Sequence, residues 1–81
     1  SGNTDAAVGQ LETAAELGMP QADFLLGLTY IRQKQHAKAV QTAEALTEKM
    51  PDNPSPYNLL GAALAGKGDL DGATAAFAKA L

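Results

Sequence analysis

The single histidine, His36, is the residue best suited to metal binding, so its neighbours in the sequence are decisive. A metal site needs several ligands at suitable spacing. Around His36 the polar residues are instead Gln33, Lys34, Gln35 and Lys38, and the chain contains no cysteine. We therefore interpret His36 as a solvated residue in a turn between two helices, and we predict no metal site.

Two pairs of glutamates could divide the roles of general acid and general base. Glu12 and Glu16 form one pair, and Glu44 and Glu48 form the other. A separation of four residues places both members of a pair on one face of a helix. Nothing near either pair in the sequence suggests a buried site with shifted pKa values, so we interpret both pairs as solvated surface.

The aspartates and glycines near the C-terminal end match no ligand-binding loop. Asp69 and Asp71 lack the further oxygen ligands that a calcium loop needs. A phosphate loop needs a preceding strand and a following Lys-Ser or Lys-Thr, which are absent around Gly61, Gly66, Gly68 and Gly72. Capping of the last helix is a sufficient role for Asp69. No Ser-His-Asp set has a supporting motif, so the sequence predicts no cofactor and no enzyme activity.

Length and charge exclude further classes of protein. The chain has 81 residues and a formal net charge of −3, so it forms at most one small domain. Its acids and bases are interspersed, whereas a nucleic-acid surface needs clustered Lys and Arg. No apolar run approaches the roughly 20 residues of a membrane span. We expect residues 1–3 to be disordered or a cloning remnant, and the chain to be a fragment.

An internal repeat organises the rest of the sequence. A shift of 34 residues places Leu25–Leu26–Gly27 on Leu59–Leu60–Gly61, and Ala39 on Ala73. Apolar residues recur at helical spacing, which predicts helices at 4–17, 21–33, 37–49, 54–66 and 70–81. The connectors are short enough to make neighbouring helices antiparallel. We expect close backbone contact where small residues face each other, at Gly61 with Ala73 and at Gly27 with Ala39.

These residues resemble the tetratricopeptide repeat (TPR) family. Its pattern is a large residue, Leu-Gly and a large apolar residue on a first helix, then Ala, an aromatic residue and Ala on a second, with a closing proline. Residues 54–81 match through Tyr57, Leu60, Gly61, Leu64, Ala73, Phe77 and Ala80. Residues 20–53 match through Leu26, Gly27, Tyr30, Ala39 and Pro51. In that earlier repeat, Asp23 replaces the first large residue and Ala43 replaces the aromatic one.

The resemblance implies an all-α fold of antiparallel helix pairs, stacked as a right-handed TPR solenoid segment of about two and a half repeats. Residues 4–81 would form one domain, in which residues 4–18 supply the second helix of a partial repeat. The first connector looks about two residues short, which would alter the superhelical turn there. The last helix has apolar residues with no following helix to cover them, so the chain either continues beyond Leu81 or self-associates.

In this family, the first helix of each repeat lines a concave groove that binds extended peptides or partner helices. The repeat register assigns that wall to Gln21, Phe24, Leu28, Ile31, Ser55, Asn58, Ala62 and Ala65. The wall is apolar with a few amides, which suits an apolar peptide or a packed helix. Phe24 and Leu28 stand where the family's clamp for chaperone carboxylates has a basic and an amide residue. The alternative is that Phe24, Leu28 and Ile31 pack against neighbouring repeats.

A narrower resemblance concerns the strings LTYIRQKQHAKAV and PDNPSPYNLLGAALAGKGDLDGA. They resemble the long repeat proteins, often lipoproteins, of PEP-CTERM/exosortase sorting and exopolysaccharide systems in Gram-negative bacteria. That resemblance implies a periplasmic or envelope-side scaffold for a protein or peptide partner. Two alternatives remain open: a structural spacer in a longer array, and a DNA-binding helix-turn-helix. The acidic charge and the lack of a basic recognition helix disfavour the second.

Overall fold

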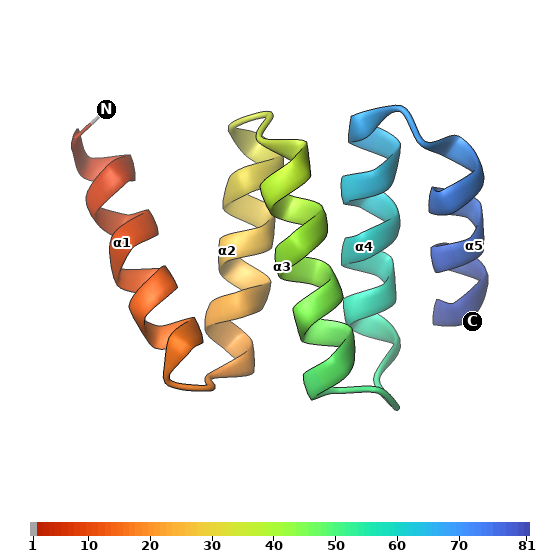
Figure 1. Ribbon diagram of the computed structural model, residues 1–81, viewed down its shortest axis with the longest axis horizontal. Coiled ribbons are helices and arrows are strands. Elements are labelled where there is room, and N and C mark those ends of the chain that lie inside the picture. The colour runs from red at the N-terminus through yellow and green to blue at the C-terminus, as the bar shows by residue number, and fades with distance from the viewer. Residues whose placement is uncertain (1) are drawn as a thin grey trace.

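Helices make up almost the whole of the computed structural model, which describes residues 2–81, with side chains from Asp5 onward. They are α1 (Gly2–Glu16), α2 (Pro20–Arg32), α3 (His36–Lys49), α4 (Pro54–Lys67) and α5 (Leu70–Ala80). Consecutive helices run antiparallel in a flat array of 36 × 25 × 14 Å (Figure 1). The bounds of α2 to α5 agree with the predicted ones within one residue. Helix α1 begins at Gly2, so residues 2 and 3, which we expected to precede it, lie within it.

Local sequence explains where α4 and α5 begin and end. Asn53 Oδ1 accepts a hydrogen bond of 2.9 Å from the backbone N–H of Ser55, and Asp69 Oδ1 accepts one of 2.9 Å from that of Gly72. These bonds satisfy N–H groups that lack a partner within the helix. Gly68 ends α4 with a φ of 95°, a left-handed conformation that costs glycine little. The predicted capping role of Asp69 is confirmed, and Asn53 caps α4 in the same way.

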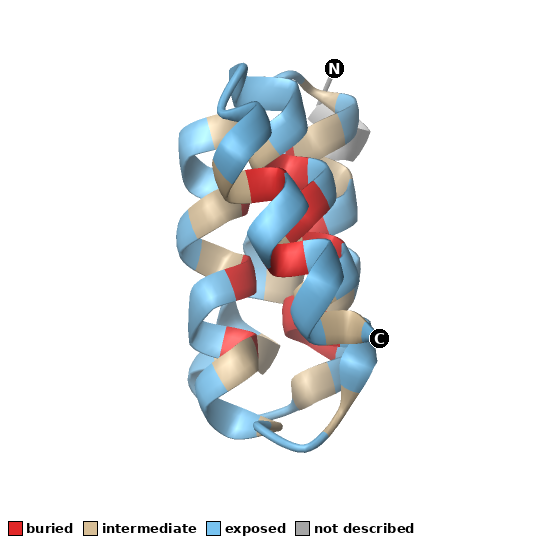
Figure 2. Ribbon diagram, turned by 90° about the vertical axis from the view of Figure 1, so that its right-hand side faces the viewer, coloured by how far each residue is buried: buried red, intermediate tan, exposed pale blue. Residues whose placement is uncertain are grey.

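The helices stack in the order of the sequence, and α2 also contacts α4. One core cluster joins Leu26, Tyr30, Ala39 and Ala63, and a second joins Ala43, Leu46 and Leu59. Each cluster takes residues from two or three helices, so no helix has a complete core of its own. Figure 2 shows the buried positions gathered on the faces where helices meet. The all-α solenoid segment is confirmed.

The structure corrects the expected partners of the two repeat glycines. A Cβ atom on Gly27 would lie 2.7 Å from Cδ2 of Leu59, and one on Gly61 would lie 2.6 Å from the ring of Phe77. The expected facing residues, Ala39 and Ala73, are not the nearest atoms at either position. Each glycine makes room for a large side chain from another helix, because an interior at crystal-like density leaves no gap at these contacts.

Leu59 also explains how the first repeat tolerates Ala43 in place of an aromatic residue. Phe77 occupies the matching position of the second repeat, and its ring covers Gly61 from within that repeat. Above Gly27, the side chain of Leu59 from the following repeat takes the same kind of position. Ala43 is fully buried and belongs to the same core cluster as Leu59. A residue of the next repeat therefore replaces the missing aromatic ring.

Asp23, which replaces the first large residue of its repeat, is buried and charged. It is 5% exposed, and its Oδ2 lies 2.5 Å from Nζ of Lys49 on α3. The same Nζ donates a hydrogen bond of 3.1 Å to the carbonyl oxygen of Ala15 at the end of α1. A polar bridge thus ties three helices together where α1 and α2 converge (Figure 1). No helix in the described part of the chain is long and apolar enough to cross a membrane.

Candidate functional site

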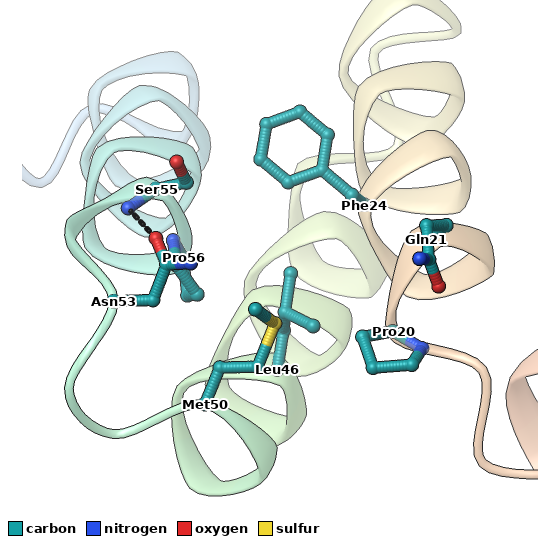
Figure 3. A pocket seen from close by; sticks show the side chains of 8 residues that line it. All are labelled: Pro20, Gln21, Phe24, Leu46, Met50, Asn53, Ser55 and Pro56. Atoms are coloured by element: carbon teal, nitrogen blue, oxygen red, sulfur yellow. Dashed lines mark hydrogen bonds between the residues drawn. The ribbon is translucent and has the colours of Figure 1, made fainter.

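A pocket of about 260 Å³ lies where the start of α2, the end of α3 and the start of α4 meet. Figure 3 shows Phe24 above the opening, Leu46 and Met50 below it, and Gln21 and Asn53 on opposite sides. The lining consists of five apolar and three uncharged polar residues: Pro20, Gln21, Phe24, Leu46, Met50, Asn53, Ser55 and Pro56. The pocket is therefore apolar at its centre and has amides at its edges.

Three residues of the predicted binding wall line this pocket, namely Gln21, Phe24 and Ser55. Phe24 is half-buried and packs against the cluster of Ala43, Leu46 and Leu59. Its ring therefore has one face in the core and lines the pocket as well. The contacts of Phe24 agree with the packing alternative, and its place in the pocket leaves the binding role a prediction.

The other five residues of the predicted wall lie outside the pocket. Leu28 is 37% exposed on α2, whereas Ile31 packs against both core clusters. On α4, the remaining three are all exposed: Asn58, Ala62 and Ala65. Leu28 is thus partly exposed to solvent, while Ile31 packs between the repeats.

Sequence reasoning missed the five remaining lining residues, Pro20, Leu46, Met50, Asn53 and Pro56. Leu46 belongs to α3, a second helix of its repeat, and Met50 directly follows that helix, whereas the family pattern places the binding wall on first helices. They reach the pocket because the end of α3 packs beside the start of α4. The clue in the sequence was the short connector after Met50, which holds Asn53 close to the end of α3.

Asn53 is held in one orientation by the start of α4. Because its Oδ1 accepts the hydrogen bond from the Ser55 N–H, its Nδ2 group is the remaining donor. None of the eight lining side chains is ionisable. The pocket can therefore contact apolar groups and donate to a carbonyl, but it has no lining charge with which to pair an ion.

A second polar contact between helices corrects the interpretation of Glu12. Its Oε2 accepts a hydrogen bond of 2.9 Å from the hydroxyl of Tyr30, so Glu12 is more than solvated surface. Burial, followed by the hydrogen bond and the negative charge of Glu12, raises the pKa of Tyr30 from 10.0 to about 12. Lys38 Nζ lies 5.7 Å from the centre of the Tyr30 ring. These contacts link α1, α2 and α3.

His36 is also placed differently from the prediction. It is half-buried, and a Cβ atom on Gly66 would lie 2.5 Å from its Nδ1. That nitrogen is buried and has no hydrogen-bond partner among the described residues. The interpretation as a solvated turn residue was wrong, because the absence of a side chain on Gly66 lets the imidazole pack between α3 and α4. Nowhere in residues 5–81 do three or more His, Cys, Asp or Glu side chains gather as a metal site would require.

A comparison with protein families agrees with the fold of stacked antiparallel helices. The family model described as tetratricopeptide repeat matches residues 1–54. The chain belongs to the tetratricopeptide repeat family. Repeats of this family generally mediate protein–protein interactions and typically act as non-catalytic scaffolds. The match covers α1 to α3, whereas the residues closest to the family pattern lie in α4 and α5. No curated protein matched the chain.

Proposed function

We propose that the chain is a non-catalytic scaffold that binds a peptide or partner helix on the face formed by α2 and α4. This face comprises Gln21, Phe24, Leu28, Ile31, Ser55, Asn58, Ala62 and Ala65, and we call it the α2–α4 face. The observation that carries the proposal is the apolar, uncharged pocket below Phe24, with the exposed Leu28 on the same helix. Apolar anchors with a few polar groups beside them are typical of peptide-binding surfaces.

Selection from a library of random peptides tests this proposal directly. The immobilised chain would select binders, which would then be measured against Leu28→Glu and the double variant Phe24→Glu/Leu28→Glu. Ala45→Glu is the matched control, because Ala45 is exposed on α3 and does not line the pocket. We expect Leu28→Glu to weaken binding by about tenfold or more, since a charge at an apolar contact costs about 1.4 kcal/mol or more.

The two variants of the α2–α4 face differ in how strongly they could destabilise the fold. Leu28 is already 37% exposed, so Leu28→Glu is expected to stay folded, and circular dichroism would check both variants. Peptides that bind all variants equally well, or the absence of any selected peptide, would overturn the proposal. The second result would favour the alternative that the segment is a structural spacer in a longer solenoid.

Self-association is a second candidate, and the exposed apolar residues of α5 favour it. Leu70 is 68% exposed and Phe77 is 42% exposed. Sedimentation of the chain over a range of concentrations would test it, with Leu70→Glu as the variant expected to abolish a dimer. A chain that stays monomeric at every concentration would remove this candidate. The role in envelope protein sorting or exopolysaccharide export rests on the resemblance of two sequence strings, and neither the fold nor the family match supports it.

A further inference from the structure

The first three residues of α4 lack the free backbone N–H groups with which helix starts usually bind anions. Its first three residues are Pro54, Ser55 and Pro56. Proline has no backbone N–H, and the N–H of Ser55 donates to Asn53 Oδ1. None of these three residues has a backbone N–H left for a ligand at the edge of the pocket.

The start of α2, on the opposite side of the pocket, also has few free backbone N–H donors. It begins with Pro20, which again has no N–H. The N–H groups of Ala22 and Asp23 both donate to the carbonyl oxygen of Met19, at 3.1 and 3.4 Å. Only the N–H of Gln21 remains in this turn. Among the first three residues of each of these two helices, only Gln21 has a backbone N–H without a hydrogen-bond partner in the described part of the chain.

The charged side chains near the pocket also give a negative ligand no partner. The helix ends around the pocket do not decide the sign, because the starts of α2 and α4 carry partial positive charge and the end of α3 carries partial negative charge. Asp52 lines a neighbouring hollow together with Met50 and Asn53. The nearest lysine on α3, Lys49, is held by Asp23 and the carbonyl of Ala15. No lining side chain supplies a compensating positive charge.

Two side-chain amides beside the pocket can form hydrogen bonds with a neutral peptide group. Figure 3 shows Gln21 and Asn53 on opposite sides of the opening, with Phe24, Leu46 and Met50 between them. The Nδ2 group of Asn53 can donate to a carbonyl, and the Gln21 amide can both donate and accept. At about 260 Å³, the pocket lies below the range of roughly 300–1,000 Å³ for whole small-molecule ligands. This volume suits one side chain of a longer polypeptide better than a whole small molecule.

We propose that this pocket holds an apolar side chain from an internal, extended stretch of the partner polypeptide, and that it discriminates against a C-terminal carboxylate, an acidic side chain or a phosphate. The inference rests on the proposed function and specifies the chemistry of the partner. The prolines at the starts of α2 and α4 and the Asn53 cap produce the discrimination, because they remove most of the backbone N–H donors there and leave mainly uncharged side-chain groups to solvate a negative charge.

The two methionines of the chain allow this to be measured with small probes. Met50 lines the pocket, whereas Met19 does not, so its methyl signal is an internal control. The protein would carry ¹³C-methyl methionine and be titrated with N-acetyl-leucine N-methylamide and, separately, with N-acetyl-leucine as the free carboxylate. We expect the amide to shift the Met50 signal saturably and to bind at least about tenfold more tightly than the carboxylate.

The variant Asn53→Gly tests the proposed cause. It frees the N–H of Ser55 and removes the Nδ2 donor, and glycine at a helix cap costs only a few tenths of a kcal/mol. We expect the ratio of amide to carboxylate affinity to fall by about tenfold. Asp69→Gly is the matched control, because it removes the cap of α5 away from the pocket and is expected to leave the ratio unchanged.

The outcomes separate this inference from the proposed function. Equal or tighter binding of the carboxylate to the unmodified chain would overturn the inference, and so would a ratio that Asn53→Gly leaves unchanged. If peptides selected on the α2–α4 face nevertheless lose affinity in Leu28→Glu, the proposed function stands without it. If neither probe shifts Met50 more than Met19, the inference fails. Only the peptide selection then decides the proposed function.

Discussion

Substitution of Gly27 by alanine tests the packing between the repeats. A methyl group at this position would lie 2.7 Å from Cδ2 and 3.3 Å from Cγ of Leu59. Leu59 would have to move, yet it is 3% exposed and packed in the cluster with Ala43 and Leu46. We therefore expect Gly27→Ala to overpack the contact between α2 and α4.

Two opposing terms set the magnitude. Overpacking a core costs about 1–3 kcal/mol, while alanine in place of glycine inside a helix contributes about 1 kcal/mol. The free energy of unfolding of Gly27→Ala should thus fall by about 1 kcal/mol, within a range of about 0–2 kcal/mol. Gly9 is the matched control, since it lies within α1 with no atom within 4 Å of its missing Cβ. Gly9→Ala should raise stability by about 1 kcal/mol.

Urea unfolding followed by far-ultraviolet circular dichroism would measure these differences. The decisive comparison repeats Gly27→Ala in a chain that carries Leu59→Ala. Removal of the leucine costs about 2–5 kcal/mol by itself, but it opens the space that the new methyl needs. In that background, Gly27→Ala should become stabilising. If Gly27→Ala stabilises the original chain as much as Gly9→Ala does, Leu59 does not block the position and the reasoning is wrong.

Three further predictions concern polar contacts. Lys49→Ala leaves Asp23 buried without its ion pair, so stability should fall by about 1–3 kcal/mol in urea unfolding. Because the pKa of Tyr30 is raised to about 12 in the folded chain from 10.0, its contribution to stability is fully present below about pH 10 and is lost as the pH rises toward about 12. Unfolding at alkaline pH should show this loss, and Tyr30→Phe should not. Asp69→Ala should cost about 1 kcal/mol of stability through loss of the α5 cap.

Controls for these predictions are available in the chain. Lys67 has no salt bridge among the described residues, so Lys67→Ala should leave stability nearly unchanged. A loss equal to that of Lys49→Ala would show that the buried pair contributes nothing specific. If Tyr30→Phe loses stability at alkaline pH as the original chain does, a group other than Tyr30 causes the effect.

The helices and their ends follow from neighbouring residues, which is why they could be predicted from the sequence. The caps at Asn53 and Asp69 bond to groups two and three residues away, and Gly68 adopts a conformation that its own backbone permits. Apolar spacing and the shift of 34 residues likewise depend only on order along the chain. The solenoid class and three of the eight pocket residues were accessible in this way.

Contacts between distant residues required the tertiary structure. The sequence pattern paired Gly27 with Ala39 of its own repeat, but the space is occupied by Leu59 of the next one. It marked Asp23 as a departure from the family pattern without revealing Lys49 as its partner.

By itself, the sequence determined which segments are helical, where they stop and which family they resemble, because hydrogen bonding within a helix and at its caps is local. Only the tertiary structure decided that a pocket lies where the start of α2, the end of α3 and the start of α4 meet, with Leu46 and Met50 on one side and Phe24 on another. The physical reason is that side-chain packing depends on volumes from several helices at once, and one glycine or alanine changes which neighbour fills the space.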